Sequence, residues 1–262
     1  MSSKNVVITQ DTVKRLLKDV RHIMKNPLND NGIYYAHDSD DMMKGYAMII
    51  GPKDTPYFGG YYFFEINYPG DYPHTPPKVI YKTNGDKVRF NPNLYTSGKV
   101  CVSLLNTWHG EQWTSCQSIS TILLTLCTLL CKDPLLNEPG LTKTHRDFDN
   151  YTKIIEYKNL EIAVLKMMEQ TPNYFPSNFT MFFSEMKENF HNNKKDLLTL
   201  IQEHKTELPE KIQISTSVYS MNIRIDYPGL LKLFRAYCKQ LENPSEEKSN
   251  KIIDNEQSSI ST

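Results

Sequence analysis

The sequence predicts an α+β domain, because one amphipathic helical pattern is followed by four strand-like runs and then by several longer helical patterns. The chain has 262 residues, the length of one large domain or of an ordinary domain with an extension. Hydrophobic residues make up 39% and charged residues 23%, a balance typical of a globular protein with a substantial core.

The first helix is expected to open at Thr9 or Asp11 and to stop before Pro27. Its apolar residues recur at three- and four-residue spacings: Val13, Leu16, Leu17, Val20, Ile23 and Met24. Its other face carries a basic stripe: Lys14, Arg15, Lys18, Arg21 and Lys25. This stripe is either a solvated surface or a binding face for a partner, and the sequence alone favours the solvated surface.

Four strands are expected next, at residues 33–37, 42–50, 61–68 and 78–82. The short links between them are rich in Asp, Gly and Pro, which predicts an antiparallel meander. In the third run the side chains alternate, so that one side of the sheet can be buried against a helix.

Residues 83–113 predict a long ordered loop, and loops of this length inside a compact domain are usually functional. Helical patterns follow over residues 117–131, 151–168, 178–204 and 229–241. The Ser-, Glu- and Asn-rich segment 243–262 predicts a disordered tail.

Composition excludes several classes of protein. Lys plus Arg and Asp plus Glu both number 30, so the total charge gives no reason to expect a nucleic-acid partner. The first ten residues lack a secretory signal, and the longest apolar stretch, 119–131, is shorter than the ~20 residues of a membrane helix. We expect a soluble protein without a membrane partner, in the cytoplasm and also in the nucleus.

The five cysteines argue against a disulfide framework, because their number is odd and the chain is expected to be intracellular. The sequence contains no Cys-x-x-Cys pair that would indicate a zinc site, and no metal is expected. Cys127 and Cys131 are expected on one buried helix face. Cys101 differs, because it lies in a segment dense with Asn, Pro and Gly.

Three segments form a joint pattern. They are Gly51-Pro52-x-x-Thr55-Pro56-Tyr57-x-Gly59-Gly60, then Tyr68-Pro69-x-x-Tyr72-Pro73-x-x-Pro76-Pro77, and last Asn91-Pro92-Asn93 with Gly98-Lys99-Val100-Cys101 and Trp113. In order and spacing this pattern resembles the ubiquitin-conjugating enzymes, over about residues 9–168. The resemblance implies the ubiquitin-conjugating (UBC) fold and a cysteine that receives ubiquitin from an activating enzyme as a thioester. It also implies transfer to a lysine amine of a protein substrate, usually with a ubiquitin ligase and without a cofactor.

Further runs resemble the larger Z-type branch of this family. They are Val88-Arg89-Phe90-Asn91-Pro92-Asn93-Leu94-Tyr95, Thr107-Trp108-x-Gly110-x-x-Trp113 and Asn137-Glu138-Pro139-Gly140. This resemblance implies a core domain over residues 1–170, a helical C-terminal extension over 171–242 and the tail over 243–262. Some members of the branch accept a second ubiquitin-like modifier.

The resemblance assigns the thioester nucleophile to Cys101, and the chemistry agrees, because a thiolate leaves a thioester far more readily than an alkoxide leaves an ester. Asn93, eight residues earlier, is either a donor to the oxyanion of the tetrahedral intermediate or a brace for the loop. Asn91 occupies the position where the family usually has His, and a loop-bracing role is implied for it. Asp133 stands where the family places a gate residue for the incoming lysine.

Three rival interpretations share these residues. The first is a catalytically inert member of the fold, against which Cys101 argues. A cysteine hydrolase would need a histidine partner, and His37, His74 and His109 show no such motif. The third interpretation keeps the mechanism and changes the modifier. We also expect Trp108 and Trp113 to be packing residues, and the Tyr72–Pro73 bond to be cis.

Overall fold

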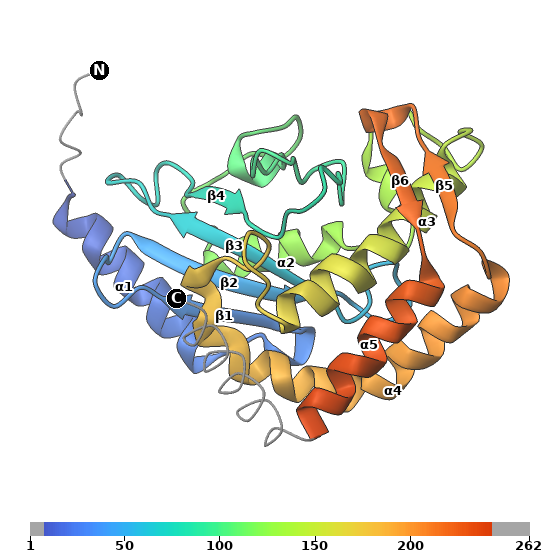
Figure 1. Cartoon of the computed structure of the whole chain (residues 1–262). Helices are drawn as coiled ribbons and strands as arrows, with labels where there is room; N and C mark the ends of the chain where they lie inside the picture. The colour runs from blue at the N-terminus through green and yellow to red at the C-terminus, as the bar shows by residue number, and fades with distance from the viewer. Residues whose placement is uncertain (1–7, 243–262) are drawn as a thin grey trace, which may run out of the picture.

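The structure is a computed structural model that describes residues 8–242 (Figure 1), so the expected tail, 243–262, lies outside the described residues. The N-terminal half contains α1 (Gln10–Lys25), β1 (Ile33–His37), β2 (Lys44–Ile50), β3 (Tyr61–Asn67), β4 (Lys78–Tyr81) and α2 (Ile119–Leu129). The C-terminal half contains α3 (Phe148–Lys158), α4 (Phe183–Glu207), β5 (Ile212–Ser215), β6 (Asn222–Ile225) and α5 (Tyr227–Glu242). A π-helical segment, Asn159–Lys166, continues α3, and a 3-10 turn, Ser177–Phe182, leads into α4.

Helix α1 begins where the sequence predicts. The side chain of Thr9 caps it by accepting a hydrogen bond from the Thr12 backbone N–H at 3.1 Å. Leu16 and Ile23 are buried on its apolar face. The hydroxyl of Thr12 donates to the Gly70 carbonyl at 2.8 Å, which ties the helix to the loop after β3.

The four N-terminal strands form an antiparallel sheet in the order β1-β2-β3-β4, which confirms the predicted meander and, with the helices around it, the UBC fold. Strand β2 begins at Lys44, two residues later than expected. The reason is a turn in which the Asp41 carboxylate accepts from the Met43 N–H at 2.9 Å and the Asp41 carbonyl accepts from the Lys44 N–H at 2.9 Å.

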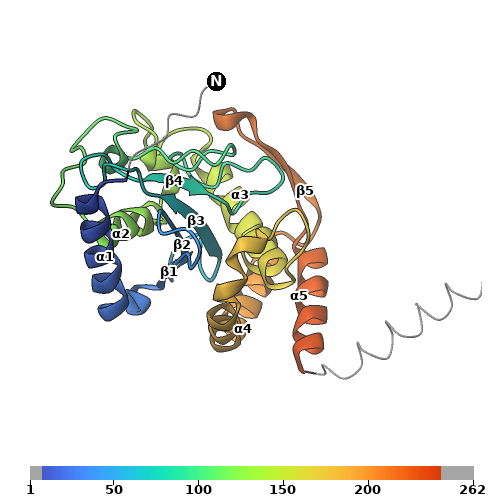
Figure 2. The ribbon, with the colours of Figure 1, turned by 90° about the vertical axis from the view of Figure 1, so that its left-hand side faces the viewer.

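Alternation along β3 sends neighbouring side chains to different layers. Tyr62 packs with Tyr57 and Phe90 on one side of the sheet. On the other side, Phe63 lies 4.8 Å from the Phe179 ring, and Tyr61 donates to the Met186 carbonyl at 2.9 Å. Figure 2 shows the resulting layers, with α1 and α2 on one side of the sheet and α4 and α5 on the other.

Helix α2 ends earlier than expected. The Leu130 N–H bonds to the Cys127 carbonyl at 3.1 Å, a tightened last turn after which the chain leaves the helix. Cys131 therefore lies beyond the helix, and Cys127 and Cys131 are half-buried. The expectation of two buried cysteines on one helix face was wrong.

Strands β5 and β6 form an antiparallel hairpin that the sequence reading missed, standing beside α3 in Figure 1. Ile214, Ile223 and Ile225 are buried on one side of it. The missed signal was the alternation in Ile-Gln-Ile-Ser and Asn-Ile-Arg-Ile.

Candidate active site

Cys101 follows the short pairing of Leu94 with Val100, in the long loop after β4. Its backbone N–H donates to the Asn93 carbonyl at 2.9 Å. The residue is only 2% exposed in this structure. The loop therefore holds Cys101 in a defined place through its backbone.

The side chain of Asn93 is hydrogen-bonded to the backbone of Cys101. Its Nδ2 donates to the Cys101 carbonyl at 2.5 Å, and its own N–H donates to Asn91 Oδ1 at 2.9 Å. Asn93 Oδ1 is buried and has no hydrogen-bond partner within the described part of the chain. A primary amide has two N–H bonds, so one donor remains after the contact with Cys101.

Asn91 is completely buried, and its side chain makes four hydrogen bonds in the described part of the chain. Its Nδ2 donates to the Leu129 carbonyl at 2.7 Å and to the Tyr57 hydroxyl at 3.0 Å. Its Oδ1 accepts from Asn93 N at 2.9 Å and from Asn137 Nδ2 at 3.4 Å. The side chain thus connects the loop, the end of α2 and the segment around Asn137.

Tyr57 and Asn137 belong to this network, although sequence reasoning gave them no role at the site. Tyr57 is fully buried and donates to the Phe90 carbonyl at 2.7 Å. Burial raises the pKa of its phenol well above the usual value, so it stays a neutral donor. Both residues lie in the family motifs quoted above, and their place in these motifs was the signal that could have indicated a role at the site.

Asp133 lies where the chain enters the 3-10 turn Pro134–Asn137. Its carboxylate pairs with the Lys143 ammonium at 2.7 Å, and its side chain is 28% exposed. Within residues 8–242, no hydrogen bond or ion pair joins Asp133 to Cys101, Asn91 or Asn93.

Thr107 is a second group at the site that sequence reasoning did not single out. Its Oγ1 accepts from the Val102 N–H at 2.9 Å and lies 2.9 Å from the Val100 carbonyl and 3.0 Å from the Val102 carbonyl. One hydroxyl therefore holds the backbone on both sides of Cys101.

The two tryptophans differ. Trp113 is buried and donates from Nε1 to the Pro73 carbonyl at 2.7 Å, which confirms a packing role. Trp108 is 40% exposed, so the expectation that it packs was wrong. The Tyr72–Pro73 bond is cis, as expected.

His37 does not form a catalytic pair. Its Nδ1 lies 2.7 Å from the Tyr35 hydroxyl, and burial is the first cause of its lowered pKa. Among residues 8–242 there is no group of three or more His, Cys, Asp or Glu side chains placed to hold a metal ion. In the same range no helix is both long enough and apolar enough to cross a membrane.

An open basic groove of about 720 Å³ lies between α1 and the segment before α2. Its charged lining includes Arg15, Lys18, Asp19, Arg21 and Lys25. Arg15 is already engaged, because it donates to Asp19 at 2.9 Å, to the Ser115 carbonyl at 2.5 Å and to the Gln117 carbonyl at 2.6 Å. Part of the basic stripe therefore joins two elements, while Lys18, Arg21 and Lys25 are exposed.

An N-terminal helix, a four-stranded meander and a loop cysteine held by an Asn-Pro-Asn segment define a ubiquitin-conjugating enzyme. Residues 15–159 match the family model described as "Ubiquitin-conjugating enzyme", and the chain belongs to this family. Its members carry ubiquitin as a thioester and transfer it, and they work with activating enzymes and ligases.

Relatives of the Z type confirm the predicted branch. The chain is 35% identical over 253 residues to ubiquitin-conjugating enzyme E2 Z of Danio rerio, covering 94% of this chain and 74% of that protein. It is 42% identical over 158 residues to ubiquitin-conjugating enzyme E2 Z of Homo sapiens, covering 59% of this chain and 44% of that protein. A match of 42% over 145 residues to the human dual E2 ubiquitin-conjugating enzyme/E3 ubiquitin-protein ligase BIRC6 covers 52% of this chain and 3% of that protein.

Proposed function

We propose that Cys101 carries ubiquitin, or a ubiquitin-like modifier, as a thioester and passes it to a lysine amine of a protein substrate. The partners in this proposal are an activating enzyme, a ligase and the substrate, and the site of action is the cytoplasm or the nucleus. The observation that carries the proposal is the Cys101 backbone, which Asn93 holds through both its carbonyl and its side-chain amide.

Charging is a transthiolation. The Cys101 thiolate attacks the carbonyl carbon of the thioester on the activating enzyme, and the activating enzyme's thiolate leaves. Because Cys101 is only 2% exposed, the surrounding loop must move locally to admit the C-terminus of the modifier.

Discharge is an aminolysis. The lysine nitrogen attacks the thioester carbonyl, the C–S bond breaks, and Cys101 leaves as a thiolate while the amine loses a proton to solvent or to a nearby carboxylate. Negative charge develops on the carbonyl oxygen, where the remaining N–H of Asn93 is the proposed donor. Asp133 is the proposed gate, and it must exchange Lys143 for the incoming ammonium to act in this way.

The proposal is tested by a charging assay with an activating enzyme, ATP and ubiquitin. The parent should give a reductant-sensitive band, Cys101→Ser a reductant-resistant oxyester, and Cys101→Ala no band. Cys116→Ser is the matched control, because Cys116 is exposed and should not affect charging. A reductant-sensitive band with Cys101→Ala would contradict the proposal.

The charged protein also tests two alternative functions, a cysteine hydrolase and a conjugating enzyme for a different modifier. A cysteine hydrolase would lose the modifier to water even without an acceptor. A conjugating enzyme should instead keep its thioester in buffer and lose it when lysine is added. A change of modifier is tested by repeating the charging assay with ubiquitin-like proteins and their activating enzymes.

We also propose that residues 1–170 form the conjugating core and that residues 171–242 are an extension that contributes no nucleophile. The extension is more than helical, because the β5–β6 hairpin lies within it.

A further inference from the structure

The turn of the β5–β6 hairpin lies against the loop that holds Asn91 and Asn93. The guanidinium carbon of Arg89 is 4.8 Å from the centroid of the Tyr219 ring in this turn. The same guanidinium is 3.3 Å from the centroid of the Tyr95 ring. A residue of the extension therefore contacts an arginine that stands two positions before Asn91.

Arg89 holds the loop through two backbone carbonyls. Its Nε donates to the Asn91 carbonyl at 3.2 Å, and its Nη2 donates to the Pro92 carbonyl at 2.6 Å. A guanidinium presents its donors in a rigid plane, so the orientation of this plane fixes where the two carbonyls lie. Contacts to the faces of aromatic rings fix that orientation.

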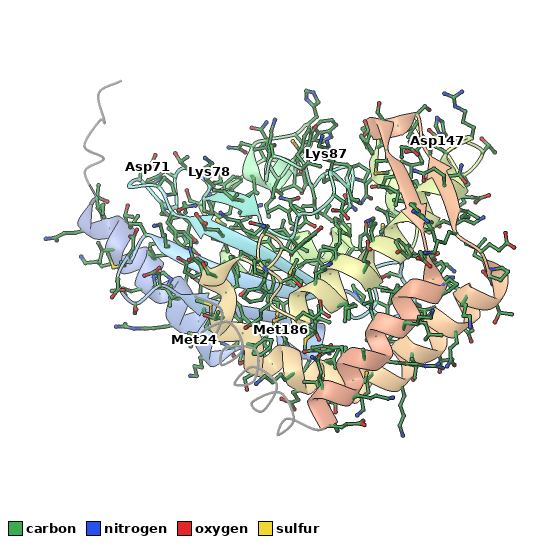
Figure 3. All side chains as sticks on the ribbon, viewed as in Figure 1. Met24, Asp71, Lys78, Lys87, Asp147 and Met186 are labelled. Carbon is green, nitrogen blue, oxygen red and sulfur yellow. The ribbon has the colours of Figure 1, made fainter. Side chains whose placement is uncertain are left out.

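Several anchors hold the hairpin turn in place. The Asp147 carboxylate accepts from Ser217 N at 2.9 Å, from Ser217 Oγ at 2.6 Å and from Val218 N at 2.9 Å. Figure 3 labels Asp147 at the end of the molecule where this turn lies. Tyr219 itself has a left-handed backbone with φ 61°, and its hydroxyl donates to Glu138.

A left-handed backbone conformation is costly for a tyrosine. The contacts of Asp147 and Glu138 offset this cost and deliver the Tyr219 ring to Arg89. The chain of contacts then runs from the Tyr219 ring to Arg89, to the Asn91–Pro92 backbone and to the Asn93 amide bonded to Cys101.

We infer that Tyr219 is a positioning residue for acyl transfer: it fixes the Arg89 guanidinium and thereby holds the Asn93 amide at Cys101. This inference rests on the proposed function, in which Asn93 serves the thioester chemistry. The extension then contributes to the reaction without touching the reacting atoms.

The test is single-turnover discharge of preformed thioester to free lysine. Tyr219→Leu removes the ring and should slow discharge by about tenfold, the rate equivalent of one cation–π contact. Tyr219→Phe loses the hydroxyl bond to Glu138 but keeps the ring, and Asp147 still holds the turn, so this variant should discharge within about twofold of the parent. If the ring had a merely structural role, Tyr219→Leu and Tyr219→Phe proteins of equal thermal stability would discharge at the same rate.

Tyr237→Leu is the matched control. Tyr237 is a buried tyrosine of the extension, whereas Tyr219 is half-buried, and Tyr237 donates to the Met168 carbonyl at 3.0 Å and packs on Phe190. Its loss should lower the melting temperature and leave discharge unchanged.

Amide NMR of the uncharged protein gives a readout that does not depend on activity. Tyr219→Leu should shift the Asn93 side-chain and backbone amide signals, and Tyr237→Leu should not. If Tyr219→Leu does not fold, Arg89→Lys replaces it, because lysine keeps the charge and loses the planar pair of donors.

The outcomes separate the inference from the proposed function. A parent that never charges on Cys101 refutes the proposed function, while the amide signals still decide whether Tyr219 positions Asn93. A parent that discharges normally, together with a folded Tyr219→Leu of parental rate and unshifted Asn93 signals, overturns the inference.

Discussion

At the residue scale, two asparagines of one tripeptide have different surroundings. Asn91 has both polar atoms of its carboxamide satisfied by protein partners and no exposure to solvent. Asn93 donates one side-chain N–H to the Cys101 carbonyl, and its buried Oδ1 has no hydrogen-bond partner in the described chain. Unsatisfied buried oxygens are rare in folded proteins and often mark functional sites. This difference supports separate roles, with Asn91 as the loop brace and Asn93 as the group next to the chemistry.

Asn93→Ala should still charge in a long incubation but should discharge to free lysine roughly 10²-fold more slowly, since one oxyanion donor contributes about 3 kcal/mol. Asn93→Asp should be at least as damaging, because a carboxylate cannot donate and would face the Cys101 carbonyl. The measurement is single-turnover discharge with thermal melts of each variant. A folded Asn93→Ala with the parental rate removes the oxyanion role, and a parallel loss of stability and rate favours the loop brace.

Asn91→Ala should instead reduce the free energy of unfolding by about 1–3 kcal/mol, because it leaves the Asn93 N–H without its partner and removes one of the two donors to the Leu129 carbonyl, the other being Asn137 Nδ2. Asn91→His restores the commoner family residue and should discharge within about tenfold of the parent, since an imidazole supplies one donor and one acceptor. Denaturant unfolding and the discharge assay measure both effects. An Asn91→Ala variant of parental stability would argue against the bracing role.

At the element scale, α1 combines a structural and an exposed basic surface. Arg15 bridges to the Ser115 and Gln117 carbonyls, whereas Lys14 and Lys18 are exposed. Surface ion pairs contribute little to stability, so the exposed lysines are free to serve association. The stripe is therefore better tested as two parts than as one.

Lys14→Glu with Lys18→Glu should slow charging by the activating enzyme, most strongly at low salt, and should leave the melting temperature nearly unchanged. Arg15→Ala should lower the melting temperature, because it removes hydrogen bonds that join α1 to the segment before α2. The initial rate of thioester formation at several salt concentrations is the measurement. Unchanged charging by the double variant would leave the stripe as a solvated face.

Sequence patterns predicted the elements whose causes are local. Thr9 caps α1 through a neighbour three residues away, and the alternation in β3 is a period-two signal. Strands β5 and β6 are short, and their apolar alternation covers only four residues each.

The contact of Arg89 with Tyr219 joins residues 130 positions apart, so no local pattern encodes it. Cys101, Asn91 and Asn93 could be proposed as site residues because they lie in one short motif, whereas Thr107 was missed because its bonds depend on the path of the loop.

Glu156 gives the junction of α3 with the later helices a pH dependence. Burial raises the pKa of its carboxyl from 4.5 to about 7, and nearby Glu207 adds to the effect. Between these pH values the unfolded chain releases the proton while the folded chain keeps it, so folding stability falls as pH rises.

Glu156→Gln should remove this loss and be more stable than the parent by on the order of 1–3 kcal/mol at pH 7.5, with little difference at pH 4.5. Denaturant unfolding at several pH values between these limits is the measurement. His204, whose pKa burial lowers, is present in both proteins and cancels in the comparison. Parallel stability curves for the two proteins would contradict the assignment.

At the scale of the whole molecule, residues of the proposed conjugating core and of the proposed extension belong to one hydrophobic core. Phe63 and Tyr46 of the sheet pack against Phe179, and Tyr61 bonds to the Met186 carbonyl of α4. Asp147 and Glu138, which precede the extension, hold the turn of its hairpin. Residues 171–242 therefore cover part of the sheet, and in our inference Tyr219 also supports the loop that holds Cys101.

Truncation should reveal both contributions. Ending the chain at residue 242 should leave charging and discharge at the parental rate, because every residue assigned to the thioester chemistry and to Arg89 support lies earlier. Ending it at residue 170 should lower the melting temperature sharply, because large aromatic side chains of the sheet lose their cover: burying one such side chain is worth about 1.5–3 kcal/mol. Any soluble fraction should still charge on Cys101, since the nucleophile remains, but should discharge at least as slowly as Tyr219→Leu. The experiment compares purified thioesters of the three lengths in single-turnover discharge, with melting temperatures recorded for each. A folded chain of 170 residues that discharges to free lysine at the parental rate would show that the extension gives the active-site loop no support.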